Sequence, residues 1–178
     1  FIGLSNGSSA FTFSIFSSLG CDTYDAQVGV IDFDGDSKDD WYCIGATNSA
    51  FYVFPSTGSS FLWPAFGSLG SSFCSTDSYI LGDFNGDGRT DAACRSNGKV
   101  ALSMGRSFLE QGAYGGWCGG DYAEAFGADL DGDGATEIVC NNMGDGATDI
   151  QVRKWTGQAL GAAETWRANW CAGKTRAG

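Results

Sequence analysis

The chain of 178 residues is 43% hydrophobic, which suffices for one domain or a compact array of small repeats. Its formal net charge of −11 argues against nucleic acid and against an anionic membrane surface as partners, because both are negatively charged. Histidine is absent, which excludes histidine-based acid–base catalysis and the commonest zinc ligand. The 28 glycines and 2 prolines favour short strands joined by turns, and no apolar run is long enough for a membrane-spanning helix.

Alternating apolar and polar residues predict short strands in three groups of four, with an acidic loop between the first two strands of each group. Four short antiparallel strands in a period of about 50 residues are typical of a propeller blade. We therefore predict an all-β fold of propeller-type blades, with about three and a half repeats visible, as part of a larger propeller or repeat array. The predicted strands are 26–33, 40–44, 51–54 and 61–66; 79–84, 92–95, 99–104 and a strand after Phe108; and 123–130, 137–141, 149–154 and 163–166.

The three acidic loops read DFDGDSKDD from Asp32, DFNGDGRTD from Asp83 and DLDGDGATE from Asp129. A hard cation such as Ca²⁺ takes about six to eight oxygen ligands, and loop positions 1, 3, 5 and 9 with the carbonyl of position 7 supply such a set. Glycines at positions 4 and 6 supply left-handed backbone, except that Ser37 stands at position 6 of the first loop and predicts a strained turn. The predicted ligands are Asp32, Asp34, Asp36, the Lys38 carbonyl and Asp40; Asp83, Asn85, Asp87, the Arg89 carbonyl and Asp91; and Asp129, Asp131, Asp133, the Ala135 carbonyl and Glu137.

Three other interpretations of these loops compete with calcium binding. An EF-hand needs a glutamate at position 12 and helical flanks, whereas position 12 here is Cys43, Cys94 or Cys140 and the flanks alternate like strands, so we reject it. Solvated Asp-Gly turns without an ion are disfavoured because clustered carboxylates repel one another without a cation. Mg²⁺ prefers fewer protein ligands and more water. The predicted cofactor is therefore Ca²⁺, about three ions with one in each self-contained loop.

Six of the seven cysteines follow the period of the loops, with one before and one after each loop. A zinc site is the alternative, but the sequence has no C-x-x-C spacing and no histidine. Disulfides that bracket the loops are therefore predicted, and Cys171 lacks a partner in the visible chain. The predicted pairs are Cys21–Cys43, Cys74–Cys94 and Cys118–Cys140.

Seven cysteines in a chain of this length favour an oxidising compartment, so we expect a secreted, extracellular or cell-surface protein. Asn6 opens an Asn-Gly-Ser glycosylation sequon, which fits secretion. Residues 2–11 resemble 100–108, which follow a loop, and ANWC ending at Cys171 parallels GGWC ending at Cys118, so the chain begins and ends inside a repeat.

From these ends we expect a segment of a longer repeat protein; two chains completing one ring, or half-blades joined end to end, are the alternatives. The expected segments are 1–20, the back half of a preceding blade; 21–69, 70–113 and 114–166, the blades with the first, second and third loops; and 167–178, the start of a further blade.

The stretches GDFNGDGRTDAAC and GADLDGDGATEIVC resemble FG-GAP/VCBS repeats, the calcium-binding blade repeats of integrin α-subunit propellers and of some fungal lectins. The resemblance covers nearly the whole chain. It implies four-stranded blades, each with a calcium ion in the loop between its first two strands, and usually about seven blades to a ring. The chain departs from this pattern because three and a half blades cannot close a ring alone.

Two binding functions are predicted, and catalysis is not expected. The first is an extracellular calcium-binding module with a structural or adhesive role, an element of a surface filament or appendage, whose partners are copies of itself, neighbouring blades or extracellular proteins. The alternative is a lectin-like propeller that recognises glycans by aromatic stacking. An enzyme is not expected because the clustered carboxylates belong to the loops and no nucleophile motif is present. The candidate stacking residues are Trp63, Trp117, Trp155, Trp166 and Trp170.

Overall fold

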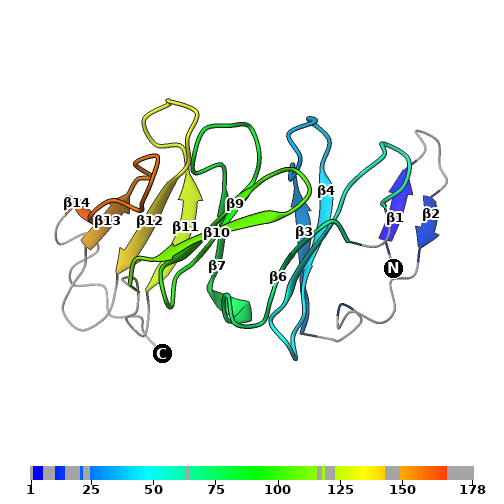
Figure 1. Ribbon diagram of the computed structural model, residues 1–178, viewed down its shortest axis with the longest axis horizontal. Coiled ribbons are helices and arrows are strands. Elements are labelled where there is room, and N and C mark those ends of the chain that lie inside the picture. Colours follow the sequence, from blue (N-terminus) through cyan, green and yellow to red (C-terminus); the bar gives the residue numbers. More distant parts are fainter. Residues whose placement is uncertain are drawn as a thin grey trace, which may run out of the picture.

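The structure is a computed structural model that describes residues 2–5, 11–14, 21, 25–62, 65–115, 118, 123–142 and 149–167. Its strands form three four-stranded antiparallel sheets and one two-stranded sheet, in which neighbours along the chain are neighbours in the sheet. This confirms the predicted all-β architecture of propeller-type blades. Figure 1 shows the sheets side by side in chain order, with the β1–β2 pair at one end and β14 at the other.

We number the four-stranded sheets as blades 1 to 3. The short pair β1 (Ile2–Ser5) and β2 (Phe11–Ser14) precedes them, and the 3₁₀ turn η1 (Thr76–Ser78) precedes blade 2. Blade 1 contains β3 (Gln27–Ile31), β4 (Asp40–Ile44), β5 (Phe51–Phe54) and β6 (Gly67–Leu69); blade 2 contains β7 (Tyr79–Gly82), β8 (Asp91–Cys94), β9 (Lys99–Ser103) and β10 (Phe108–Ala113); blade 3 contains β11 (Glu124–Ala128), β12 (Glu137–Asn142), β13 (Asp149–Arg153) and β14 (Glu164–Arg167).

One predicted strand is wrong. The last strand of blade 1 is β6, not residues 61–66. After β5 the chain makes a tight turn in which Thr57 N donates to Ser60 O at 2.8 Å, and Phe61 then forms only an isolated bridge with Ser56. The Thr57 hydroxyl also accepts from Ser60 N at 3.0 Å, so local side-chain bonds favour a turn where the aromatic residues suggested a strand.

The two faces of blade 2 pack against different neighbours. Residues directly opposite on antiparallel strands share a face, so the pairs Gly29↔Tyr42, Ile80↔Ala93 and Phe126↔Val139 mark one face of the three blades. In blade 2 this face packs on blade 3, because Ile80 and Ala93 share a buried cluster with Ile138. The opposite face of blade 2, which carries Ala92, packs on blade 1.

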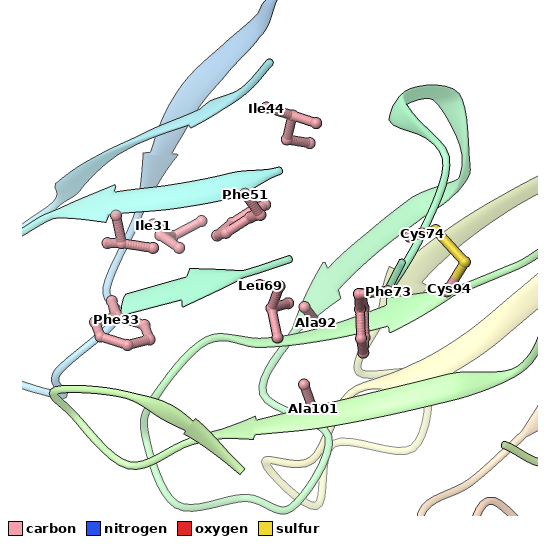
Figure 2. Packing of buried hydrophobic residues seen from close by; sticks show 11 residues of the cluster. Ile31, Phe33, Ile44, Phe51, Leu69, Phe73, Cys74, Ala92, Cys94 and Ala101 are labelled. Atoms are coloured by element: carbon pink, nitrogen blue, oxygen red, sulfur yellow. A yellow bond between two sulfur atoms is a disulfide. The ribbon is translucent and has the colours of Figure 1, made fainter. Parts of the chain in front are cut away.

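The core between blades 1 and 2 fits large side chains against small ones (Figure 2). Phe33 and Phe51 of blade 1 are fully buried, and both contact the ring of Phe108 with centroid distances of 5.0 and 5.7 Å. Blade 2 meets them with Ala92 and Ala101, whose small side chains leave room for the rings. The two sheets can therefore approach each other closely.

A close approach also explains one glycine of this core. A Cβ at Gly67 would lie 2.5 Å from Cζ of Phe33, so any side chain there would force the ring out of its buried place. Strand β6 therefore starts with the one residue that allows Phe33 to lie across it.

All three predicted cysteine pairs are disulfides in the structure. Each joins the segment before a blade to the second strand of that blade, with Cα–Cα distances of 5.9, 5.4 and 5.7 Å. A closed loop of this length stabilises the fold by roughly 3 kcal/mol through the entropy of the unfolded chain. Figure 2 shows the Cys74–Cys94 bond beside Phe73 at the edge of the core.

Some predictions fall on residues outside those that the structure describes. These are the sequon at Asn6, the unpaired Cys171 and the candidate stacking residues Trp63, Trp117 and Trp170. The predicted segment boundaries also stay predictions. Among the described residues, no helix is long and apolar enough to cross a membrane.

Candidate metal centres

The three acidic loops occupy the same place in the three blades. Each connects the first strand to the second, β3 to β4, β7 to β8 and β11 to β12, and Figure 1 shows all three at one edge of the array. The loops take the same place because the strands pair in the same register. In every blade, position 9 of the loop, which is the first residue of the second strand, pairs with the last residue of the first strand. These pairs are Ile31↔Asp40, Gly82↔Asp91 and Ala128↔Glu137.

The carboxylate at position 1 organises each loop by accepting backbone N–H groups. Asp32 accepts from Gly35 N at 2.8 Å and from Ser37 N at 2.9 Å, at positions 4 and 6, and Asp129 accepts from the same two positions. Asp83 accepts from Asp87 N at position 5 and from Gly88 N at position 6. The loop can turn this sharply because positions 4 and 6 take positive φ. Ser37 does so at φ 65°, where the other loops have glycine, which agrees with the strain predicted for the first turn.

Two groups of carboxylates are close enough for one cation. Asp32, Asp34 and Asp36 each offer an oxygen within 4.8 Å of the others, and Asp129, Asp131 and Glu137 do the same in the third loop. Two ligands of one Ca²⁺ lie at most about 5 Å apart, since each bond is about 2.3–2.6 Å long. The residues of these loops therefore fit a hard, oxygen-liganded cation in both spacing and donor type.

The second loop has the same backbone but one carboxylate fewer. Its position 3 is Asn85, whose side-chain Nδ2 donates a hydrogen bond to Asp87 Oδ2 at 3.0 Å. The side-chain oxygen Oδ1 of Asn85 is therefore the atom that can ligate a cation. Asp87 Oδ1 accepts from Arg89 N at 3.0 Å, as the position-5 carboxylates Asp36 and Asp133 do in their loops.

The predicted position-9 ligands of the first two loops are buried and are bound by backbone amides inside the blades. Asp91 is fully buried and accepts from Phe84 N at 3.0 Å and from Ser103 N at 2.7 Å. Asp40 is also buried and accepts from Phe33 N and Ser56 N in the same way. Both oxygens of each carboxylate are thus engaged by backbone, although each oxygen retains a second lone pair.

The third loop differs at this position. Glu137 is buried and accepts from Leu130 N at 2.8 Å through Oε2, while its Oε1 lies 3.7 Å from Nζ of Lys154. The residue at the place of Ser56 and Ser103 is Trp155, and among the described residues only the amide of Leu130 donates to this carboxylate. The longer side chain of Glu137 reaches the Asp129 and Asp131 oxygens instead.

Burial and neighbouring charge set the protonation of these carboxyls. Burial raises the pKa of Asp91 to about 7, although the two backbone N–H groups oppose the shift. Burial also raises the pKa of Asp40 above its usual value. The hydrogen bond from Lys38 lowers the pKa of Asp36, and that from Lys154 lowers the pKa of Asp131, so these two exposed groups remain charged.

Every loop also holds one basic side chain, which the sequence analysis missed. Lys38 contacts Asp36, Arg89 contacts Asp87, and Lys154 contacts Asp131. Lys38 and Arg89 stand at position 7 of their loops, where the sequence predicts only the carbonyl as a ligand. Lys154 directly follows β13. The signal for Lys154 was a lone lysine at a place where blades 1 and 2 have Pro55 and Leu102.

Neighbouring loops are bonded to each other across the blade interfaces. Thr90 N donates to Asp32 O at 2.7 Å, and Thr136 N donates to Asp83 O at 2.6 Å. The buried hydroxyl of Ser103 in blade 2 donates to the carbonyl of Phe33 in blade 1. The loops are therefore less self-contained than the sequence predicted.

Four-stranded blades with an acidic loop of this pattern between the first two strands define a class of repeat proteins with propeller-like folds. The chain matches the FG-GAP-like repeat family over residues 32–94 and 83–140 and belongs to that family. No curated protein matches it. Among solved structures, it is similar to an Agrocybe aegerita lectin described for its specific recognition of non-reducing terminal N-acetylglucosamine, with a TM-score of 0.60 and 19% identity.

That similarity covers 90% of this chain and 44% of the lectin chain. The chain thus spans less than half the length of the lectin, and at this identity the likeness supports the fold alone.

Proposed function

We propose that the chain is an extracellular calcium-binding repeat module with a structural or adhesive role, as an element of a surface filament or appendage. The observation that carries the proposal is the set of three acidic loops at one edge of three disulfide-bonded blades. Two of the loops bring three carboxylate oxygens within 4.8 Å of one another. Such groups repel one another unless a cation is present.

The residues that would hold the ions come from this chain alone. Asp32, Asp34 and Asp36 would supply the first site, and Asp129, Asp131, Asp133 and Glu137 the third, with the carbonyl of position 7 as a further ligand in each loop. Asp83, Asn85 and Asp87 would supply the second. Ca²⁺ would neutralise the clustered carboxylates and so hold each loop to its blade. For this, Lys38, Arg89 and Lys154 must move away from the ligand oxygens that they contact.

The structural and extracellular parts of the proposal rest on the same features. Disulfides persist in oxidising compartments, and here each of three blades carries one. Catalysis is not part of the proposal, because the described carboxylates with clustered geometry are those of the loops. Copies of the chain or neighbouring blades are the proposed partners.

Glycan binding is the second candidate, and the similarity to a lectin favours it. Of the described tryptophans, Trp166 is 47% exposed and is the better candidate for stacking on a sugar. Trp155 packs edge-on against Tyr114 with a centroid distance of 6.1 Å and belongs to the core between blades 2 and 3.

The metal content tests the calcium proposal directly. The chain, equilibrated with millimolar CaCl₂ and desalted, should retain about three calcium ions by native mass spectrometry, one per loop. A chain that retains none, and whose melting temperature is the same with CaCl₂ as with EGTA, would refute calcium binding.

Electron microscopy of the unreduced material in CaCl₂ separates the two roles. Filaments would support the structural role, whereas discrete rings together with saturable binding on a glycan array would support the lectin.

A further inference from the structure

The strongest feature that calcium binding leaves unexplained is the pair of hydrogen bonds between neighbouring loops. In both interfaces the donor is the amide of position 8, Thr90 or Thr136, and the acceptor is the carbonyl of position 1 in the preceding loop, Asp32 or Asp83. The bonds are short, at 2.7 and 2.6 Å, and they join the same two positions twice. The same hydrogen bond is therefore a regular feature of the interfaces between adjacent blades.

The peptide group that donates this bond is the one whose other end is a predicted ligand. The N–H of Thr90 and the carbonyl of Arg89 belong to one planar trans peptide, so they point in opposite directions. When the N–H points at Asp32, the Arg89 carbonyl is directed away from blade 1. The same holds for Thr136 and the carbonyl of Ala135.

The same parts of adjacent loops also lie close together. A Cβ at Gly35, position 4 of the first loop, would lie 3.0 Å from Cγ of Arg89, position 7 of the second. A Cβ at Gly86 would lie 3.7 Å from Cβ of Ala135, at the same two positions one blade further on. At Gly132, position 4 of the third loop, such an atom would meet nothing within 4 Å among the described residues.

We propose that Asp32 and Asp83 are positioning residues for the next loop: their main-chain carbonyls orient the position-7 carbonyl ligand, so that adjacent cation sites are coupled and the first and third are not. This inference rests on the proposed calcium binding. Ordering of Asp32 by ligation of its side chain fixes the acceptor for Thr90, and thereby the ligand peptide of the second loop. Coupling of this kind is reciprocal, so the second site strengthens the first equally.

Variants of the entire chain in which one of the three cation sites is inactivated test the proposal, and they include an internal control. Asp36→Ala, Asp87→Ala and Asp133→Ala each remove the same position-5 carboxylate, so the three variants are matched. Cation sites 1 and 2 stay intact in Asp133→Ala, and sites 2 and 3 stay intact in Asp36→Ala. Asp87→Ala keeps only the non-adjacent sites 1 and 3. Pairwise combinations of the substitutions give the single-loop references.

Isothermal titration with CaCl₂ should show cooperative binding in both adjacent pairs, with the second ion bound at least about five-fold more tightly than in the single-loop chains. The pair of loops 1 and 3 should bind as two single loops. Equal cooperativity in all three pairs would mean a general effect on folding and would overturn the proposal. Absence of cooperativity in all three pairs would overturn it as well. A wild-type chain that takes up no calcium would instead refute the proposed function.

Hydrogen exchange gives a second measurement that does not depend on affinities. In the Asp133→Ala chain, CaCl₂ should slow exchange of the Thr136 amide at least about five-fold, although its own loop is inactivated, because its acceptor lies in the occupied second loop. Unchanged exchange at Thr136, with slowed exchange at the amides of loop 2, would overturn the proposal.

Discussion

The second and third loops share one sequence pattern but are supported differently. In the second loop, Asp91 is fixed inside the blade by two backbone amides, from Phe84 and Ser103. In the third, Glu137 has one such bond, and its other oxygen faces Lys154 and the Asp129 group. The comparison shows that a longer side chain at position 9 brings its carboxylate to the other loop carboxylates, whereas aspartate is held by backbone amides inside the blade.

The largest expected effect is that of removing calcium from both kinds of loop together. Each site contributes about 2.7 kcal/mol to the free energy of unfolding at a calcium concentration 100 times its Kd. Each kcal/mol shifts the melting temperature of a domain of this size by about 2–4 °C. Scanning calorimetry in CaCl₂ and in EGTA should therefore differ by well over ten degrees, by about 16–32 °C for three sites.

MgCl₂ in place of CaCl₂ is the control for this measurement, because Mg²⁺ prefers ligands with more water. Equal melting temperatures in MgCl₂ and CaCl₂ would contradict a site made for Ca²⁺.

Truncation of the position-9 side chain should separate the two loops in the absence of metal. Asp91→Ala leaves two buried N–H groups without an acceptor, whereas Glu137→Ala leaves one, and each such group costs about 1–3 kcal/mol. Urea unfolding in EGTA should therefore show the larger loss for Asp91→Ala. A larger loss for Glu137→Ala would show that the contacts of Glu137 with the acidic group and Lys154 dominate.

The burial of Asp91 also predicts how the stability of the metal-free protein depends on pH. Its pKa is about 7 in the fold against 3.8 for an ordinary aspartate, so between these values the folded state holds a proton that the unfolded state has lost. Stability is therefore highest near the lower value and falls as pH rises to about 7, by up to about 1.4 kcal/mol per pH unit.

Urea unfolding in metal-free buffer at pH 5 and pH 8 measures this dependence, and Asp91→Asn is its control. The variant should lose this part of the slope, because its side chain does not titrate. A slope that persists unchanged in Asp91→Asn would assign it to other carboxyls.

Much of this fold could be predicted because each repeat carries the residues that its turns and strands require locally. The Asp-Gly pattern fixes the turns, and alternation fixes strands such as β4 and β5, whose bounds agree with the prediction. What the sequence could not supply depends on contacts between blades. The bond from Thr90 to Asp32, and that from the Ser103 hydroxyl to the Phe33 carbonyl, arise from residues far apart in the chain and carry no local pattern.

Prediction was also limited where two local preferences compete. Residues 61–66 contain aromatic residues that favour a strand, but the hydroxyl bonds of Thr57 stabilise the turn before them, and pairing resumes only at Gly67. Likewise, Lys154 follows a strand as an ordinary surface lysine would. Only the register of β12 and β13, in which Val139 pairs with Val152, places it beside the third loop.

The smallest expected effect sharpens the comparison at Lys154. Its Nζ contacts Asp131 and lies 3.7 Å from Glu137 Oε1, so it occupies oxygens that a cation needs. Lys154→Met keeps the length of the side chain and removes the charge. Because the lysine side chain is 40% exposed, solvent screens this competition, and the gain in calcium affinity of the third loop should be only about two- to five-fold. Titration of a chain that retains only this loop measures it. The matched substitution Arg89→Met in a chain that retains only loop 2 should have a similar effect. A loss of affinity in Lys154→Met would instead mean that Lys154 organises the ligands, which would make the third loop a site that depends on β13 as well as on its own nine positions.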